Sequence, residues 1–189
     1  MASTVDLARE LHERGAILSG HFRLSSGRHS ATFVQKFRIL EDPQLVEVVA
    51  REIADAFRHE YPTVVVSAAV GGIVLGFEVA RHLGTKAIFV EKEDGRAVLR
   101  RGFTLTQNDR ALVVEDVITT GGSVREVLDV VRSHRASLVG IGAIVRRAPV
   151  DFGIPTVALL DLPIESFDEA SCPQCARSEA IADPGSRRT

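Results

Sequence analysis

The sequence predicts an α/β protein built on a mainly parallel, twisted sheet with helices on both faces. Short runs of β-branched and small apolar residues recur along the 189-residue chain, and segments with helical periodicity separate them. Such runs are typical of strands buried on both faces of a parallel sheet. Apolar residues make up 45% of the chain and Trp is absent, which favours this class over a β-sandwich. Strands are expected near residues 63–67, 86–90, 111–115, 138–145 and 156–160.

A single domain is expected for a chain of this length. Its predicted parts are an N-terminal hairpin at about 15–40, a core at about 41–162 and a C-terminal tail at 163–189. The net charge of −2 argues against a nucleic-acid-binding surface. No apolar run reaches ~18 residues, so no membrane span is expected. The charged start of the chain shows no secretory signal, and the two cysteines point to the reducing cytoplasm.

Two helices are expected before the repeating strand–helix pattern. Thr4–Arg14 has an amphipathic pattern that its first residue caps and Gly15 ends. Pro43–His59 has a proline in its first turn and either Glu41 or Asp42 as its cap. Both helices are expected to pack through one apolar stripe.

A hairpin is expected between these helices, within Gly20–Arg38. Phe22 and Leu24 alternate with polar neighbours, and a turn signal follows at Ser25–Arg28. The second strand of the hairpin is expected at Thr32–Arg38. By itself this pattern also fits a surface hairpin with one core phenylalanine.

The most informative stretch of the chain is Ala111–Arg125. An apolar strand at Ala111–Val114 leads into two acids, Glu115 and Asp116, where the strand is expected to end. A loop of small residues then opens an amphipathic helix. The loop residues are Thr119, Thr120, Gly121, Gly122 and Ser123. Glycines that turn backbone N–H groups inward, followed by a helix start, form a typical phosphate site.

The acid pair separates this site from the common nucleotide-binding loops. No Gly-Lys-Ser/Thr follows the glycines, and no G-x-G-x-x-G is present. Carboxylates beside a phosphate repel it, so Glu115 and Asp116 need another partner, such as ribose hydroxyls or a nearby magnesium ion. A ribose 5-phosphate meets both requirements. The remaining interpretation is an ordinary capped turn between a strand and a helix.

The run V-V-E-D-V-I-T-T-G-G-S resembles the phosphoribosyl-pyrophosphate (PRPP) motif of type I phosphoribosyltransferases. The resemblance implies that Glu115 and Asp116 bind the ribose diol and that residues 119–123 bind the 5′-phosphate. It implies a catalytic role for Asp116 and Lys92. It also implies Mg²⁺ as the cofactor, held through the substrate, with Asp116 acting on it indirectly.

The hairpin resembles that of the orotate phosphoribosyltransferases, where it forms a hood over the base and covers the carboxyl ends of the strands. The matching run is G-H-F-R-L-S-S-G-R-H-S-A-T-F-V-Q. The resemblance implies that the orotate site contains Ser26, Phe33, Val34, Gln35, Thr119 and Arg147. Arg147 would face the orotate carboxylate, and Phe33 would offer a flat surface to the ring.

Two further segments would bind the pyrophosphate in this family. The turn after the strand at 63–67 would use its backbone amides, at Ala69, Val70, Gly71 and Gly72, although Gly71 stands where many orotate enzymes carry lysine. Without the family, this turn could serve close packing alone. The charged segment Glu91–Phe103 has no clear periodicity and is expected to be a mobile loop.

That charged segment carries the predicted pyrophosphate cations, because a leaving pyrophosphate needs positive charge around it. They are Lys92, Arg96 and Arg100, with Arg101 as a further cation. The segment departs from the family in having Glu91 in place of an arginine and in lacking a histidine. The resemblance implies a homodimer in which residues 91–102 reach the neighbouring site. Each arginine could instead belong to a solvated loop.

The tail contains Cys172-Pro-Gln-Cys175, which is half of a zinc site. Zinc needs further ligands, so the alternative is a pair of free thiols. The last residues, 183–189, are expected to be disordered.

Together these features predict an orotate phosphoribosyltransferase, which forms orotidine 5′-monophosphate and pyrophosphate from PRPP and orotate in pyrimidine biosynthesis. Two alternatives stay open at this point. One is a phosphoribosyltransferase for a purine base, and the other is a non-catalytic regulator that senses PRPP. The hairpin favours orotate over a purine, and the sequence shows no helix-turn-helix unit or basic stripe for a regulator.

Overall fold

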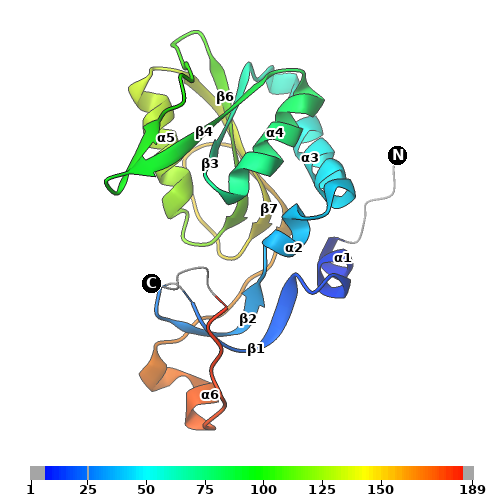
Figure 1. Cartoon of the computed structure of the whole chain (residues 1–189), viewed down its shortest axis with the longest axis vertical. Coiled ribbons are helices and arrows are strands. Elements are labelled where there is room, and N and C mark those ends of the chain that lie inside the picture. Colours follow the sequence, from blue (N-terminus) through cyan, green and yellow to red (C-terminus); the bar gives the residue numbers. More distant parts are fainter. Residues whose placement is uncertain (1–6, 25, 185–189) are drawn as a thin grey trace. The chain divides into compact units, whose positions relative to one another are not determined.

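The computed structural model describes residues 7–24 and 26–184, which form two compact units (Figure 1). The core unit is Leu40–Leu162. The hairpin unit combines the described residues before position 40 with those from Pro163 onward. Among the described residues, no helix has the length and apolar character needed to cross a membrane. The predicted cap at position 4 and most of the predicted disordered end lie outside the described residues.

The core unit contains a six-stranded sheet in the order β5-β4-β3-β6-β7-β8. The strands are β3 (Val64–Ala68), β4 (Lys86–Glu93), β5 (Arg96–Leu99), β6 (Arg110–Ile118), β7 (Ser137–Arg146) and β8 (Thr156–Asp161). Every pairing is parallel except that of β4 with β5. All five predicted strands are confirmed, and β8 lies at the sheet edge as expected. The β-branched runs form the buried centre because helices cover both faces.

The two faces of the sheet are covered by different helices (Figure 1). On one face lie α3 (Pro43–Phe57), which continues into η1 (Arg58–Glu60), and α4 (Gly71–Leu83); on the other lies α5 (Gly122–Ser133). Strand β7 shows how this is achieved. A Cβ at Gly140 would lie 2.1 Å from the Phe57 ring of α3, so glycine allows α3 to approach. The next residue, Ile141, is buried in the cluster that contains Val127 and Val131 of α5.

The start of α3 confirms one of the two predicted caps. The Asp42 carboxylate accepts hydrogen bonds from the backbone N–H groups of Gln44 and Leu45, at 2.9 and 3.2 Å. These contacts satisfy two of the N–H groups that a helix start leaves without an intrahelical partner. The helix ends at Phe57, two residues before the predicted end, because the chain tightens into η1.

The loop before β6 is fastened by Asp109, whose carboxylate is almost fully buried. It accepts hydrogen bonds from the N–H and Oγ1 of Thr106, at 2.7 and 2.9 Å, and pairs with Lys86 Nζ at 3.0 Å. Burial alone would raise the pKa of this carboxyl. The ammonium and the Thr106 donors outweigh burial and hold the pKa below its usual value.

The hairpin unit contains α1 (Leu7–Glu13), β1 (Ile17–Arg23), β2 (His29–Val34), α2 (Phe37–Leu40), η2 (Glu169–Ser171) and α6 (Pro173–Ala176). Strands β1 and β2 are antiparallel, as predicted. The predicted bounds of the second strand are wrong, because β2 begins at His29 and the chain turns after Val34. Two turn hydrogen bonds cause this, from Arg38 N–H to the Gln35 carbonyl and from Ile39 N–H to that of Lys36, both 3.0 Å.

The C-terminal segment runs along the β1–β2 hairpin. Backbone bridges join His29 to Phe167 and Phe22 to Ala182. The Arg28 guanidinium pairs with the Asp168 carboxylate at 2.7 Å. The hairpin unit is therefore assembled from the two ends of the described chain, and the segment 165–182 packs along the β1–β2 hairpin.

Candidate active site

The sheet topology places one candidate site at the carboxyl edge of the core unit. Strands β3 and β6 are neighbours, yet the helices that follow them, α4 and α5, lie on opposite faces. This is a topological switch point, where α/β sheets bind their ligands. The loops after β3 and β6 meet this edge, and the ends of β4 and β7 flank them.

The predicted phosphate loop joins β6 to α5. Gly121 has φ +79°, and a Cβ there would lie 2.7 Å from Arg125 Nη1 and 2.8 Å from the Phe152 ring, so this position requires glycine. Thr119, Thr120 and Ser123 are exposed. Within the described chain no side chain caps α5. The first N–H groups of a 12-residue helix therefore point out of the loop, as a phosphate site needs.

The acid pair lies inside the strand, so the prediction that β6 ends at these acids is wrong. Glu115 pairs with Ala143 of β7, and β6 continues to Ile118. Both side chains are buried, with 7% of Glu115 and 2% of Asp116 exposed. The Glu115 carboxylate accepts the Asp116 N–H at 3.1 Å, and the Asp116 carboxylate accepts the Val117 N–H at 2.6 Å. These backbone contacts hold both carboxylates just before the phosphate loop.

The predicted pyrophosphate turn follows β3. Ala69 N–H donates to the Val90 carbonyl at 2.9 Å, which joins the turn to the end of β4. Helix α4 begins at Gly71, and within the described residues no side chain caps it. A Cβ at Gly72 would lie 3.0 Å from Ser67 Cβ, so this glycine serves close packing of α4 on β3. The turn therefore combines both predicted features: a helix start that no described side chain caps and a glycine that allows close packing.

Most of the charged segment belongs to a β-hairpin, so the prediction of a loop without strands is wrong. Strand β4 extends to Glu93, the chain turns at Asp94 and Gly95, which have φ +50° and +77°, and β5 returns antiparallel. A two-residue turn with both φ values positive suits a hairpin.

The cations of this hairpin are mostly paired. Lys92 Nζ lies 2.9 Å from Glu126 of α5. Arg100 pairs with Glu93 at 2.9 Å, and Arg101 with Glu91 at 2.8 Å. Arg96 is exposed at the start of β5. Lys92 thus lies beside the helix that starts at the phosphate loop, whereas Arg100 and Arg101 pair with carboxylates of their own hairpin.

Arg147 is located where β7 leaves the sheet. Its N–H donates to the Ile118 carbonyl at 2.8 Å, so it lies beside the last residue of β6. Burial lowers the pKa of its guanidinium. Its Nε is buried and has no hydrogen-bond partner among the described residues. A half-buried cation with an unsatisfied buried donor fits an anionic ligand.

The other predicted orotate residues belong to the hairpin unit. Ser26 lies in the β1–β2 turn, and Phe33 and Val34 end β2, with Gln35 directly after them. The Phe33 ring packs against Phe22 with 5.8 Å between centroids. The structure therefore keeps these four residues on one hairpin, whereas Thr119 and Arg147 belong to the core unit.

Arg125 is a further residue of this site that was not predicted from the sequence. Its Nη1 donates to the Thr120 carbonyl at 3.3 Å, and its guanidinium lies 5.0 Å from the centre of the Phe152 ring. This places a fixed cation against the phosphate loop. The available signal was a basic residue three positions after the Gly-Gly pair, within the first turn of α5.

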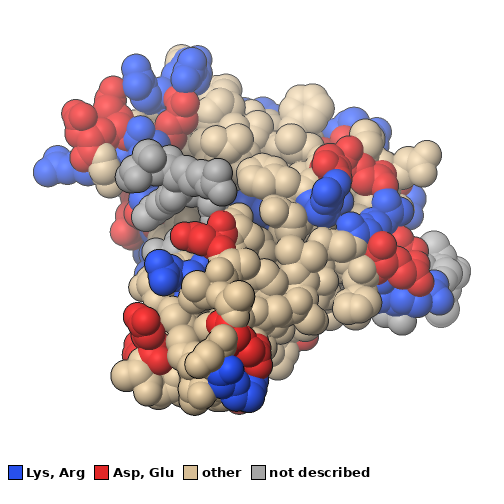
Figure 2. All heavy atoms as spheres, turned by 60° about the horizontal axis from the view of Figure 1, so that its bottom comes forward, with Lys and Arg blue, Asp and Glu red and all other residues tan. Residues whose placement is uncertain are grey.

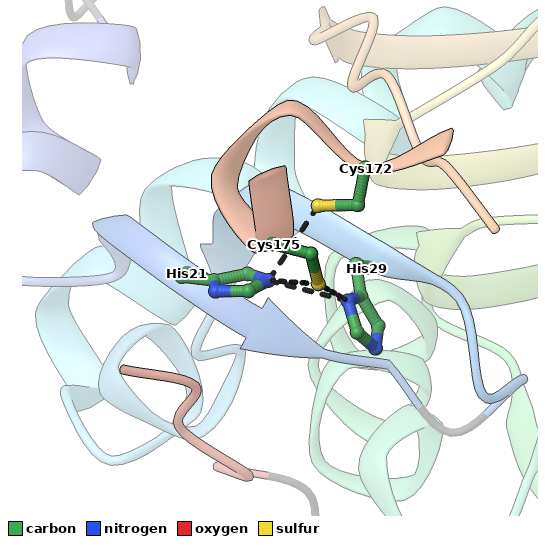
Figure 3. Close-up of side chains that lie close together, drawn as sticks. All are labelled: His21, His29, Cys172 and Cys175. Atoms are coloured by element: carbon green, nitrogen blue, oxygen red, sulfur yellow. Dashed lines mark hydrogen bonds between the residues drawn. The ribbon is translucent and has the colours of Figure 1, made fainter. Parts of the chain in front are cut away.

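A second cluster lies in the hairpin unit. Cys172 and Cys175 are near His21 and His29, and the four ligand atoms lie within 4.8 Å of one another (Figure 3). Burial alone would raise the pKa of the Cys172 thiol. Hydrogen bonds from the backbone around Cys175 and from His29 outweigh it and lower this pKa to about 6. The sequence indicated the cysteines but not the two histidines.

The core unit is thus a sugar-phosphate-binding α/β structure of the phosphoribosyltransferase class. The phosphoribosyl transferase domain matches residues 37–149. Orotate phosphoribosyltransferase from Caldanaerobacter subterraneus is 43% identical over 182 residues, which cover 95% of this chain and 96% of the relative. The same-named protein from Pelotomaculum thermopropionicum is 46% identical over 176 residues, or 92% and 93% of the two chains. The chain belongs to the orotate phosphoribosyltransferase family.

Solved structures agree on the fold. Orotate phosphoribosyltransferase from Aeropyrum pernix superposes with a TM-score of 0.70 at 27% identity, covering 82% of this chain and 93% of the other. Adenine phosphoribosyltransferase from Thermoanaerobacter pseudethanolicus gives 0.62 at 16% identity, covering 69% and 88%. The fold is therefore shared by enzymes for different bases, and the base must be identified from residues outside the common sheet.

Proposed function

We propose that the protein transfers ribose 5-phosphate from PRPP to a ring nitrogen of orotate, giving orotidine 5′-monophosphate and pyrophosphate. The supporting observation is the loop from Thr119 to Ser123, an uncapped helix start at the switch point, directly after Glu115 and Asp116. Near-full-length similarity to orotate enzymes supports orotate as the base. The pathway served is de novo synthesis of pyrimidine nucleotides.

In this mechanism the protein positions two substrates and stabilises charge. The N–H groups at the start of α5 and the Thr119, Thr120 and Ser123 hydroxyls bind the 5′-phosphate, with Arg125 adding positive charge nearby. Glu115 and Asp116 bind the ribose diol. The transition state at the anomeric carbon is positively charged, so in-line placement and electrostatics account for most of the catalysis.

The departing pyrophosphate is bound by the turn at residues 69–72 and by cations of the β4–β5 hairpin. Lys92 is the cation that the structure favours most for this role, because its partner Glu126 is on the helix that starts at the phosphate loop. Arg96 and Arg100 are the further cations. On binding, Lys92 exchanges an exposed ion pair for a doubly charged ligand, which is favourable because exposed pairs contribute little.

A magnesium ion fits the chemistry of these residues, because hard cations prefer carboxylate, hydroxyl and phosphate oxygens. It would be held through the substrate's ribose and pyrophosphate oxygens, with Asp116 acting on it indirectly. When bound, it would neutralise part of the charge on the leaving group. Glu115 and Asp116 orient the diol so that this arrangement can form.

Orotate recognition falls to Arg147 and to Ser26, Phe33, Val34 and Gln35 of the hairpin unit, with Thr119. The unsatisfied Nε of Arg147 suits the orotate carboxylate, which a purine base lacks. This difference supports orotate over a purine. The face in Figure 2 gives no support to a PRPP-sensing regulator, since its visible cations and acids lie interspersed rather than in a basic stripe.

We further propose a homodimer, formed through α4, with residues 91–102 acting near the neighbouring site. A mostly apolar groove of about 600 Å³ is lined by Leu40, Pro43, Val46, Ile73, Val74 and Phe77, together with Glu47 and Glu78. Phe77 is 65% exposed and Val74 49%, on the same helix. Large apolar side chains exposed together mark an interaction surface.

The expected location of the protein is the cytoplasm, where both free cysteines stay reduced.

The deciding experiment measures pyrophosphate release from PRPP and Mg²⁺ with orotate, adenine or xanthine as the acceptor. Turnover with orotate alone is expected, with orotidine 5′-monophosphate as the second product. Turnover with a purine instead would replace the proposal by the purine alternative. PRPP binding without turnover of any base would support the regulator.

A further inference from the structure

We propose that His21, His29, Cys172 and Cys175 form a structural zinc site inside the hairpin unit (Figure 3). The four residues come from three places in the chain: β1, β2 and the turn that forms α6. None of them belongs to the PRPP site. The Cys-x-x-Cys spacing supplies two ligands from one turn, and the β1–β2 hairpin supplies the other two.

Four distances within the cluster, between 3.1 and 3.7 Å, are close to those around one tetrahedral ion. Zn–N bonds of ~2.1 Å and Zn–S bonds of ~2.3 Å at tetrahedral angles separate two nitrogens by about 3.4 Å and a nitrogen from a sulfur by about 3.6 Å. His21 Nε2 lies 3.2 Å from His29 Nδ1. It lies 3.5 Å from Cys172 Sγ and 3.7 Å from Cys175 Sγ. Cys175 Sγ lies 3.1 Å from His29 Nδ1.

The protonation of His21 agrees with a ligand role. Its Nδ1 lies 3.0 Å from the Glu179 carbonyl oxygen, which can only accept, so Nδ1 carries the proton. The lone pair of Nε2 then points into the cluster, toward both sulfurs and His29 Nδ1. A second hydrogen bond that fixes the tautomer and the ring orientation is typical of histidines that bind zinc.

Three of the four ligands are buried, and Cys175 is partly buried. His21 is 5% exposed, His29 2% and Cys172 3%. Four protein ligands leave no open position for water or substrate, which is the pattern of structural rather than catalytic zinc. Two sulfurs and two imidazoles also select zinc over Mg²⁺ or Ca²⁺, which prefer oxygen. Both sulfurs bind as thiolates, so binding releases any thiol proton that is still present.

The site would fasten the C-terminal segment to the hairpin. Around it, Gln174 Nε2 donates to the Gly20 carbonyl at 2.9 Å, and Ser30 Oγ donates to that of Glu165 at 2.8 Å. Phe22, beside His21 in β1, packs against Phe33. The ion would therefore stabilise the hairpin that carries Phe33, a consequence for base binding that rests on the proposed function.

The test starts from protein expressed with added ZnSO₄ and passed through a desalting column. Elemental analysis is expected to find about one zinc per chain in wild type. The double variant Cys172→Ser/Cys175→Ser is expected to lose it. His59→Asn, at an exposed histidine of the core unit, is the matched control and is expected to keep it. Zinc in the serine variant equal to wild type would overturn the proposal.

A second measurement covers the case in which the serine variant does not fold. Zinc is removed from wild type with a chelator and Co²⁺ is added. Tetrahedral coordination by two thiolates gives an intense visible absorption band with a sulfur-to-cobalt band in the near ultraviolet, saturating at about one Co²⁺ per chain. A weak octahedral spectrum would refute the site, as would intact mass showing a Cys172–Cys175 disulfide in freshly purified protein. Both measurements are independent of turnover, so inactive protein with stoichiometric zinc would contradict only the proposed function.

Discussion

Replacing Asp116 by Asn tests whether the buried acid pair binds the ribose diol. Only 2% of Asp116 is exposed, and its Oδ1 accepts the Val117 N–H at 2.6 Å. The amide oxygen of Asn keeps that acceptor, so the fold is expected to persist. The substitution removes a charged hydrogen bond to the substrate, which contributes about 1.5–3 kcal/mol. At about 1.4 kcal/mol per tenfold, kcat/KM for PRPP should fall about 10- to 100-fold.

The assay follows orotate consumption at varied PRPP, with thermal unfolding measured in parallel. Asp129→Asn is the matched control, because Asp129 is an exposed acid of α5 whose side chain is 75% accessible. It should keep wild-type kinetics. Wild-type kcat/KM in Asp116→Asn, with an unchanged melting temperature, would refute the diol role. A large loss of stability would show instead that the carboxylate serves the fold.

Three other perturbations probe separate parts of the molecule. Arg147→Gln should lower kcat/KM for orotate about 10- to 100-fold with little change in KM for PRPP, because it removes one charged donor; equal losses for both substrates would contradict this. Phe77→Glu should raise the dimer dissociation constant at least about tenfold in sedimentation equilibrium, since it places a charge in an apolar groove, while the exposed control Tyr61→Glu should not. Asp109→Asn should cost about 1–3 kcal/mol of unfolding free energy near neutral pH. The folded-state pKa of Asp109 is lowered, so its contribution is present above the unfolded pKa and is lost as pH falls through the folded one. Chemical unfolding at several acidic pH values should therefore show wild type and variant converging; a constant gap would contradict the assignment.

The strands and the phosphate loop could be predicted because local sequence determines them. Runs such as Val64–Val66 suit a strand buried on both faces, and Gly121 needs a positive φ that other residues adopt at a cost. The end of β6 could not be predicted in this way. The apolar pattern stops at Glu115, but β7 offers backbone partners as far as Arg146, so the ladder continues through both acids. Pairing with a neighbouring strand overrides the local signal.

The β4–β5 hairpin could have been predicted from the sequence, but a loop was predicted in its place. Asp94-Gly95 is among the strongest short hairpin signals. The high charge of the segment suggested a loop. In the structure, Leu99 and Phe103 pack against the core cluster, while the charged residues pair with one another on the exposed side. Apolar residues at the end of the segment therefore decide its structure more than its charge does.

The four cluster residues show a different limit, because about 150 positions separate the histidines from the cysteines and only the folded hairpin unit brings them together. The cluster and the phosphate loop belong to different units, so their substitutions are expected to have separate effects. Loss of zinc would act within the unit that carries Phe33, whereas Asp116 lies in the core unit. Changes at sites without shared partners usually add. Zinc removal should therefore raise KM for orotate while leaving KM for PRPP near its wild-type value, and combined with Asp116→Asn the two losses should multiply. A non-multiplicative result would mean that the two units act as one element during turnover.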